Sequence, residues 1–595
     1  MSADSTKDNV VRLHPGAGRN KSRIHLRGRQ VNLDTLAQLR QLMGDQPIKR
    51  DMLVEYLHLI QDNFGYLSAA HLAALAHEMN IPMAEVYECA TFYAHFDIVK
   101  EGELPPPAVT VRVCDSLSCQ LAGAVQLKAA IEAGTDPTEV RIVNAPCMGR
   151  CDTAPVAEVG HYHVDRADAA KVVAAIEAKH FHPEIPDYLA YDAYVAEGGY
   201  TLLKQCLAGD YSWEDIQKVL ADANLKGLGG AGFPTHMKWK FVRQEPKPRY
   251  LAINGDEGEP GTFKDRLYLE SDPHRFIEGA LISAWAVEAE AAYIYLRDEY
   301  PAALEILKAE IGKVEDAGLA PAGGIHLRRA AGAYICGEES AMIESLEGKP
   351  GMPRHRPPFV AQVGLFNRPT LVNNIETVFW IRTLVDKGAE WFSSQGRNGS
   401  HGLRSFSVSG RIKNPGVKLA PAGITMQELM EEYCGGMADG HTFKGYLPGG
   451  ASGGILPAGM ADIPLDFGTL NKYGCFIGSA AVVVLSDQDN IRNVVVNLLK
   501  FFEDESCGQC TPCRVGTEKM VKLLQRPDWD KALMAELSQA MCDASICGLG
   551  QAASNPINTV FKYFDADLIA TDLSTTTNKY FDADLIAIDL SASAK

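Results

Sequence analysis

Four cysteines near the C-terminus have a spacing suited to iron–sulfur chemistry. The segment ESCGQCTPCRVGT contains Cys507, Cys510 and Cys513 as C-x2-C-x2-C, and Cys547 follows in SICGLG. Three thiolates at this pitch on a tight loop can bind three corners of an iron–sulfur cube, while a distant fourth closes the last corner. Zinc sites more often pair two separate C-x2-C knuckles, so the spacing favours a [4Fe-4S] cluster over zinc and over inert core thiols.

A second set of four cysteines lies closer to the N-terminus. Cys114 and Cys119 form a C-x4-C pair, and Cys147 and Cys151 form a C-x3-C pair. Two loop pairs can hold a rhombic [2Fe-2S] cluster from opposite sides, although the spacing alone also permits tetrahedral zinc. Two such sets in one acidic chain strengthen the redox interpretation of both. The remaining six cysteines are scattered and are predicted to be buried small hydrophobic residues: Cys89, Cys206, Cys336, Cys434, Cys475 and Cys542.

Four glycine-rich loops lie between the two cysteine sets. The first, GLGGAGFPTHMKWKF at 227–241, places four glycines ahead of a predicted helix, where they let backbone N–H groups approach a phosphate or a flavin ring. Its spacing differs from the G-x-G-x-x-G fingerprint and is a weak signal alone. The other loops are NGDEGEPGTFKDR from Asn254, the segment from Gly332 to Phe359, and RPTLVNNIET from Arg368. Solvated surface charge is the alternative interpretation of the acidic residues in the second loop.

Short strands are expected to position the N-terminal cysteines. Alternating valines at 109–113 predict a strand that ends at Cys114, and a second strand at 141–143 leads to the loop of Cys147. The alternation at 156–164 predicts a hairpin. Together these elements predict a compact α/β unit with cysteines at its loop tips.

Helices and strands are expected in the rest of the chain, with a small β-rich insert at 403–487 that has short alternating runs such as Phe406 and Val408. Apolar residues at i, i+3, i+4 and i+7 from Leu53 predict an amphipathic helix. Ser68 is predicted to cap a further helix, and Pro82 to be the first residue of the next one. Residues 480–485 predict a buried strand, and 491–504 predict a helix that leads to the C-terminal cysteines.

Composition limits the possible functions. The 595 residues are 46% apolar and 22% charged, which is typical of a globular protein. The net charge of −18 opposes sequence-independent phosphate binding, so we expect no nucleic-acid partner. No stretch reaches the roughly 18 apolar residues of a membrane span, so we expect no membrane insertion. At the C-terminus, KYFDADLIATDLS at 562–574 recurs at 579–591 with one substitution, and we assign this repeat no function.

The loops and the cysteine motifs together closely resemble one family. Residues 200–562 resemble the flavin-carrying NADH dehydrogenase subunit of respiratory complex I. Residues 31–180, which include VYECATFYAHF at 86–96, resemble the thioredoxin-like [2Fe-2S] subunit of the same complex. Two subunits are therefore expected to be fused in one chain, and the resemblance implies an α/β multidomain fold.

The resemblance implies this order of domains along the chain. A flexible tail at 1–30 precedes a helical subdomain at 31–105, a thioredoxin-like 2Fe-2S domain at 106–180, a linker at 181–200 and a Rossmann-like FMN/NADH-binding domain at 201–400. These are followed by a β-grasp (ubiquitin-like) domain at 401–488, a helical 4Fe-4S domain at 489–562 and a tail with the tandem repeat at 563–595.

The resemblance also implies which residues bind FMN, NAD(H) and the two clusters. NADH is expected to stack between the flavin and aromatic rings, and no catalytic acid or base is expected because hydride transfer needs none. Two positions depart from the family, since Leu228 replaces an arginine and Arg356 replaces a lysine. The implied FMN residues are Gly227, Gly229, Lys238, Asn254, Asp256, Glu257, Tyr334, Glu338, Asn373 and Asn374. The implied NADH residues are Phe233, Phe241, Glu259, Glu339, Arg356 and Phe359. The implied ligands are Cys507, Cys510, Cys513 and Cys547 for 4Fe-4S, and Cys114, Cys119, Cys147 and Cys151 for 2Fe-2S.

Within this family, the fused chain is most similar to the beta subunit of molybdenum- or tungsten-dependent, NAD-linked formate dehydrogenases. The stretches LYLESDPHRFIEG, GLFNRPTLVNNIE and FFEDESCGQCTPCR carry this resemblance. It implies a cytoplasmic diaphorase subunit whose partner is a large catalytic subunit with molybdopterin and further iron–sulfur clusters. The diaphorase subunit of NAD-reducing nickel–iron hydrogenases is the second hypothesis. A zinc-stabilised, non-catalytic assembly subunit is the hypothesis from a different class.

Overall fold

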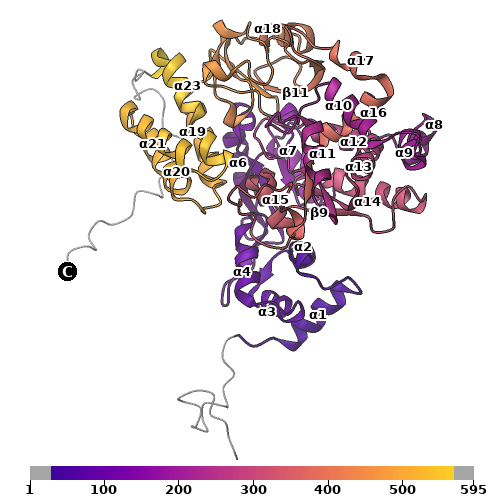
Figure 1. The fold of residues 1–595 in the computed structure, drawn as a ribbon. Helices are drawn as coiled ribbons and strands as arrows, with labels where there is room; N and C mark the ends of the chain where they lie inside the picture. Colours follow the sequence, from indigo (N-terminus) through magenta and orange to yellow (C-terminus); the bar gives the residue numbers. More distant parts are fainter. Residues whose placement is uncertain (1–28, 569–595) are drawn as a thin grey trace, which may run out of the picture.

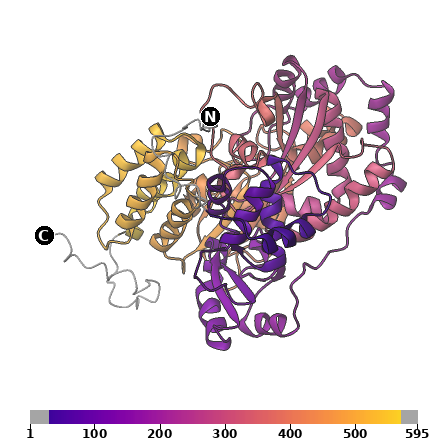
Figure 2. The same ribbon diagram turned by 90° about the horizontal axis from the view of Figure 1, so that it is seen from below.

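A computed structural model describes residues 29–568 of the chain. The predicted tail at 1–30 lies almost wholly outside these residues, and so does the second copy of the tandem repeat. Figures 1 and 2 show the C-terminal helices as a lobe beside the rest of the molecule, and Figure 1 shows the N-terminal helices at another end. None of the helices in the described part of the chain is long and apolar enough to cross a bilayer.

Four helices form the N-terminal unit, and they pack around the apolar face predicted from Leu53. Leu53, Tyr56, Leu57 and Ile60 are fully buried. Ser68 caps the third helix in a reciprocal capping box, as predicted. Pro82 differs from its prediction, because its ψ of 137° is extended and the fourth helix begins one residue later. The elements are α1 Leu33–Met43, α2 Leu53–Phe64, α3 Ala69–Glu78 and α4 Met83–Phe92, with the parallel strands β1 Leu67–Ser68 and β2 Ile98–Val99.

The next unit is a four-stranded sheet in the order β4-β3-β5-β6. The strands are β3 Val109–Cys114, β4 Val140–Ala145, β5 Ala157–Val159 and β6 Tyr162–Val164, and the helices are α5 Leu117–Leu121, α6 Ala124–Gly134 and α7 Ala169–Glu177. The pair β3 and β4 is parallel, whereas β5 and β6 form the antiparallel hairpin predicted from the alternation. The predicted strands and hairpin are therefore confirmed.

The largest unit is built on a parallel sheet in the order β10-β7-β8-β9. The strands are β7 Arg249–Gly255, β8 Ala289–Leu296, β9 Ile325–Arg329 and β10 Thr370–Asn374. The helices are α8 Tyr191–Ala196, α9 Thr201–Ala208, α10 Trp213–Asp222, α11 Thr235–Gln244, α12 Lys264–Ser271, α13 Pro273–Val287, α14 Pro301–Asp316, α15 Glu339–Leu346, α16 Ile375–Lys387 and α17 Ala389–Ser393. Because all four strands run the same way, their carboxyl ends meet at one edge, where open α/β sheets bind ligands.

A five-stranded mixed sheet follows in the order β12-β11-β15-β13-β14. Its strands are β11 Leu403–Gly410, β12 Gly416–Pro421, β13 Phe443–Leu447, β14 Leu456–Pro457 and β15 Ala481–Ser486, and its helix is α18 Met426–Glu428, extended by a π-turn at Leu429–Tyr433. The first and last strands are parallel neighbours at the centre, which is the β-grasp arrangement. Every residue of β15 is buried, as predicted for this segment.

The C-terminal unit is helical. It contains α19 Ile491–Asp504, α20 Thr511–Leu524, α21 Lys531–Ala544, α22 Gly548–Ala552 and α23 Asn555–Tyr563. Helix α19 has the predicted bounds, and Asn490 caps its first turn. The first copy of the tandem repeat begins at the end of α23 and is described only as far as Leu568.

Candidate functional site

The four glycine-rich loops meet at the carboxyl edge of the parallel sheet. A Cβ added to Gly229 would lie only 2.9 Å from the Cβ of Asn374, so the first loop packs tightly on the end of β10. The backbone N–H of Leu228 donates to Thr377 Oγ1 on α16 at 2.9 Å. The side chain of Leu228 is buried, so the position where the family has arginine here serves packing. These contacts leave a backbone surface without side chains, as close approach to a cofactor requires.

The loop after β7 contains a buried polar atom that has no partner. Asn254 Nδ2 donates to the carbonyl of Gly337 at 2.8 Å, and Asn254 Oδ1 accepts from the N–H of Asp256 at 3.0 Å. Asp256 Oδ2 is buried without a hydrogen bond, and burial raises the pKa of this carboxyl well above its usual range. Orphaned buried oxygens are rare because each costs about 1–3 kcal/mol. A hydroxyl or ring N–H of a bound flavin fits this position.

Four charged residues form a chain beside the first loop. Lys238 Nζ lies 3.5 Å from Glu339, and Glu339 lies 3.3 Å from Arg356. Arg356 also pairs with Glu338, whose carboxylate caps α15 through the N–H groups of Ser340 and Ala341. The structure therefore brings the predicted FMN residues Lys238 and Glu338 together with the predicted NADH residues Glu339 and Arg356.

Other predicted residues already bind protein groups. Glu257 accepts hydrogen bonds from the N–H of Asp265 and from Tyr300 Oη, and burial raises its pKa to about 7. Asn374 donates to Asp265 at 2.6 Å and caps α16. When the side-chain amide of Asn373 is assigned so that both of its groups form hydrogen bonds, its oxygen accepts from Trp239 Nε1 at 3.0 Å. Their roles in FMN binding stay predictions.

Aromatic rings lie open to solvent near this edge. Phe233, Phe241 and Phe359 are 41%, 42% and 53% exposed, and the rings of Phe233 and Phe241 are 6.4 Å apart. Exposed phenylalanines of this kind suit the stacking of a planar ring. By contrast, the predicted NADH residue Glu259 is half-buried, and its carboxylate accepts hydrogen bonds from Tyr334 Oη and from the N–H and Oγ of Ser452.

One hydrogen bond joins the flavin loops to the C-terminal cysteine loop. The backbone N–H of Tyr334 donates to Glu505 Oε2 at 2.9 Å, and the ring of Tyr334 lies 4.9 Å from that of Phe501. Burial raises the pKa of Glu505 to about 7. Sequence reasoning missed Glu505, although an acidic residue directly before a cysteine motif was a usable signal.

The four C-terminal cysteines converge from two helix starts. Cys510 precedes α20, Cys547 precedes α22, and a Cβ added to Gly550 would lie 2.8 Å from the Cβ of Cys513. Burial raises the pKa of Cys513 and of Cys547 to about 11. Thiols with such pKa values stay protonated at neutral pH unless a metal binds, so this donor set fits an iron–sulfur cluster whose iron stabilises the thiolates.

The N-terminal cysteines are buried and paired. Cys147 Sγ lies 3.4 Å from Cys151 Sγ, and Cys114 hydrogen-bonds with Cys119. The contact with Cys151, followed by the charge of Arg297 and by backbone N–H groups, lowers the pKa of Cys147 to about 6 despite its burial. Arg297 Nη atoms donate to the carbonyls of Cys147 and Glu257. Sequence reasoning missed Arg297, for which no motif gives a signal.

The cysteine sulfurs of neither set are already grouped around one tetrahedral zinc position. A tetrahedral site with Zn–S bonds of about 2.3 Å places its sulfurs about 3.8 Å apart. Within residues 29–568, no three cysteine sulfurs lie within 4.8 Å of one another. In the N-terminal set, the close pairs Cys114–Cys119 and Cys147–Cys151 fit one pair on each iron of a [2Fe-2S] cluster.

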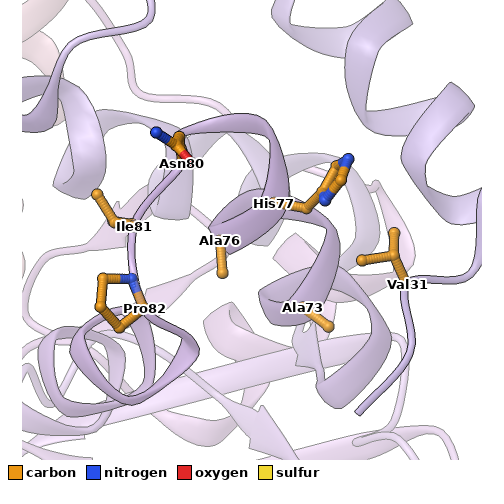
Figure 3. A pocket seen from close by; sticks show the side chains of 7 residues that line it. All are labelled: Val31, Ala73, Ala76, His77, Asn80, Ile81 and Pro82. Carbon is orange, nitrogen blue, oxygen red and sulfur yellow. The ribbon is translucent and has the colours of Figure 1, made fainter. Parts of the chain in front are cut away.

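Two further observations concern residues outside these sites. Five of the six scattered cysteines are buried as predicted, but Cys542 is exposed on α21, so its prediction is wrong. Figure 3 shows the side chains that line a hollow between the start of α1 and the helices α3 and α4. The hollow has a volume of about 480 Å³. Its walls contain none of the predicted site residues: Val31, Ala73, Ala76, His77, Asn80, Ile81 and Pro82.

Comparison with known proteins agrees with this arrangement. The thioredoxin-like [2Fe-2S] ferredoxin family matches residues 39–180, the Nuo51 FMN-binding domain matches 220–383, and the iron–sulfur binding region of NADH-ubiquinone oxidoreductase-F matches 493–571. The chain is 39% identical to the mitochondrial NADH-ubiquinone oxidoreductase 51 kDa subunit of Neurospora crassa over 394 residues, which are 63% of this chain and 80% of that protein. The chain belongs to the family of this 51 kDa subunit.

Other members of the 51 kDa family are similarly related. The mitochondrial NADH dehydrogenase [ubiquinone] flavoprotein 1 of Dictyostelium discoideum is 38% identical over 405 residues, which are 64% of this chain and 84% of that protein. Among solved structures, the H2-reduced NAD+-reducing [NiFe]-hydrogenase matches with a TM-score of 0.77 and 30% identity, over 88% of this chain and 92% of that one. This member of the family is therefore a fused NADH-dependent flavoprotein of the diaphorase type, with FMN, NAD(H), one 2Fe-2S cluster and one 4Fe-4S cluster.

Proposed function

We propose that this chain is the diaphorase subunit of an NAD-dependent formate dehydrogenase. In this proposal, formate is oxidised on a large partner subunit that contains molybdopterin with molybdenum or tungsten and further iron–sulfur clusters. Formate releases CO2, a proton and two electrons, and NAD+ takes up two electrons and one proton to form NADH. The exchange balances and is reversible.

The contact between Tyr334 and Glu505 is the observation that supports electron exchange within the chain. Tyr334 belongs to a predicted flavin loop, and Glu505 is two residues before the predicted ligand Cys507. Bound FMN supplies the conversion between two-electron hydride transfer and one-electron transfer through clusters. The residues of this chain need only hold the nicotinamide against the exposed aromatic rings and keep the flavin loop on the cluster loop.

The choice of formate rests on the sequence. The stretches at 267–279, 364–376 and 501–514 are similar to beta subunits of formate dehydrogenases. Of these, 364–376 leads into β10 and 501–514 includes three predicted cluster ligands. This similarity favours a molybdopterin partner over one with nickel and iron.

A hydrogenase partner is the second candidate. The solved structures of an NAD+-reducing [NiFe]-hydrogenase match this chain over 88% of its length at 30% and 31% identity. That likeness covers both the thioredoxin-like and the flavin units, so it supports the same electron-exchange role with hydrogen as the electron source.

We also propose a cytoplasmic location. All fourteen cysteines are free, and eight of them form the two predicted cluster sets. Disulfides form in oxidising compartments, whereas thiolates that bind iron need a reducing one.

Co-purification tests the partner. The chain, tagged at its N-terminus, is purified anaerobically from its source, and the large subunit that accompanies it is identified by mass spectrometry and metal analysis. Molybdenum or tungsten, with NAD+ reduction that depends on formate, is the expected result. Nickel, with NAD+ reduction that depends on hydrogen, would replace the formate assignment with the hydrogenase one. A complex without either activity, in which NADH does not bleach the flavin absorbance, would overturn the electron-exchange role itself.

A further inference from the structure

A group of polar side chains outside the flavin and cluster sites lies where the N-terminal helices meet the flavin unit. His58 and Asp62 are one turn apart on α2, and His95 follows α4. A ring nitrogen of each histidine and a carboxylate oxygen of Asp62 lie within 4.8 Å of one another. Within residues 29–568, no other three His, Cys, Asp or Glu side chains have this spacing.

Each histidine is held at one ring nitrogen by an acceptor. His95 Nδ1 lies 2.7 Å from Asp298 Oδ2, and His58 Nε2 lies 2.9 Å from the carbonyl oxygen of Ala330. Because both partners accept, the bonded nitrogens carry hydrogen, and the opposite nitrogens of neutral rings present lone pairs. A carboxylate or a backbone carbonyl behind the ring is the arrangement that orients imidazoles toward metal ions.

The two opposite nitrogens are buried and have no hydrogen-bond partner. These atoms are His58 Nδ1 and His95 Nε2. The side chain of His95 is 7% exposed, His58 is 3% exposed, and the two ring centroids are 4.9 Å apart. Two lone pairs cannot bond to each other, and an unsatisfied buried acceptor costs about 1–3 kcal/mol. A cation between the rings satisfies both.

The surrounding charges also favour a cation. Arg329 pairs with both Asp62 and Asp298, so the group keeps one net negative charge when His58, His95 and His161 are all neutral. His161 of the β5–β6 turn lies 3.7 Å from Asp62 and adds a contact from the thioredoxin-like unit.

We propose that His58, Asp62 and His95 bind one divalent transition-metal ion, with zinc as the ion that fits best. Two imidazoles and one carboxylate are a common three-ligand set for zinc, and the fourth position takes water. The side chain of Asp62 is 40% exposed, so water and the ion have access from this side.

The site would fasten three parts of the chain together. Asp298 lies just after β8, and Arg329 is the last residue of β9. The N–H of His95 donates to the carbonyl of Ala331 at 3.2 Å. The same segment continues to Tyr334 of the flavin loop. The ion therefore holds the motif VYECATFYAHF against the strand end that leads into the predicted flavin site.

Metal analysis of the full chain tests the proposal. The protein is purified anaerobically, supplied with zinc and desalted, and zinc and iron are measured together. We expect about one zinc atom beside roughly six iron atoms per chain. His58→Ala and His95→Ala should lose this zinc and keep the iron, whereas the exposed His77→Ala on α3 should keep both. A zinc content no higher than background in the wild-type protein, or an undiminished zinc content in His58→Ala, would overturn the proposal.

A second measurement does not depend on the variants folding. Zinc-edge X-ray absorption of the wild-type protein should show only nitrogen and oxygen neighbours near 2.0–2.2 Å, with imidazole scattering. Sulfur neighbours at about 2.3 Å would place the zinc in the cysteine sets and contradict the proposal. Absence of bound zinc would favour the competing occupant, a proton carried by His95 and donated to His58.

Discussion

The backbone N–H of Tyr334 donates to the carboxylate of Glu505 at 2.9 Å, and this bond connects the flavin unit with the loop of the C-terminal cysteines. Two units that are far apart in the chain thus share a part-buried polar contact beside both predicted redox sites. The contact therefore links the loop that carries Tyr334 directly to the loop that carries the predicted cluster ligands.

Replacing Glu505 should slow electron transfer to the cluster. In Glu505→Ala the N–H of Tyr334 loses its acceptor, and an unsatisfied buried donor costs about 1–3 kcal/mol, so the loop should reposition. We expect formate-dependent NAD+ reduction in the complex to fall about 10-fold, which corresponds to about 1.4 kcal/mol. NADH oxidation by ferricyanide, which can take electrons at the flavin, should stay near wild type. Glu505→Gln keeps an acceptor and is the matched control. Equal losses in both assays would contradict this role.

Adding one carbon to Gly229 should weaken FMN binding. The new Cβ of Gly229→Ala would lie 2.9 Å from the Cβ of Asn374, and such overpacking costs about 1–3 kcal/mol, which shifts the loop. The FMN content after gel filtration should therefore fall well below that of the wild-type protein. Gly312→Ala on α14 adds a methyl group to open space and should leave the FMN content unchanged. Full FMN occupancy in Gly229→Ala would show that the loop does not approach the cofactor.

Removal of one predicted cluster ligand should abolish that cluster and leave the other one in place. Cys510→Ser should reduce the iron content from roughly six to roughly two atoms per chain, because the [2Fe-2S] ligands lie in another unit. Cys542→Ser, at an exposed cysteine on α21, should keep all the iron and serves as the control. Paramagnetic resonance of the reduced proteins identifies the cluster that remains. Loss of iron in Cys542→Ser instead would reassign the ligand.

Stability should decline as pH rises toward neutrality, in part because of Glu158 on β5. Burial raises the pKa of this carboxyl from about 4.5 to about 7. Between these values the unfolded chain releases its proton before the folded chain does, so the unfolded state binds fewer protons and stability falls with rising pH. Above pH 7 the effect levels off. Glu158→Gln should therefore show a smaller drop in Tm between pH 5 and pH 8 than the wild type, while Glu139→Gln, at an exposed position, should behave like the wild type. An unchanged drop in Glu158→Gln would exclude this carboxyl as the cause.

Local patterns predicted the elements well. The alternating valines of β3, the hairpin of β5 and β6, and the bounds of α19 follow from periods of two and 3.6 residues. The pairing of the N-terminal cysteines follows from their short separation in the sequence, because a short loop keeps the two sulfurs of a pair close together. The prediction for Cys542 was wrong because a single cysteine on a helix forms no pattern that shows which face is buried.

Contacts between units were beyond such reasoning. Arg297, Glu505 and the group of His58 with His95 acquire their surroundings only when segments hundreds of residues apart meet, as His58 does with Ala330. The side chains of Glu257 and Asn374 show the same effect, since protein partners that the motif does not contain bind them. Sequence motifs thus predicted where the loops gather, whereas tertiary packing decided which atoms remain free for a ligand.

Arg297 donates to the carbonyl of Cys147 and to the carbonyl of Glu257, so one buried cation serves both the 2Fe-2S loop and a flavin loop. Thermodynamic linkage is reciprocal. If an electron added at the 2Fe-2S loop draws this cation closer, the free energy of ligand binding at the flavin loop must change by the same amount as the free energy of cluster reduction. Reduction of the 2Fe-2S cluster should therefore alter the affinity of the flavin loop for its ligands, and ligand binding should shift the cluster potential by the matching amount. The redox state of the 2Fe-2S cluster would in this way influence binding at the nucleotide site.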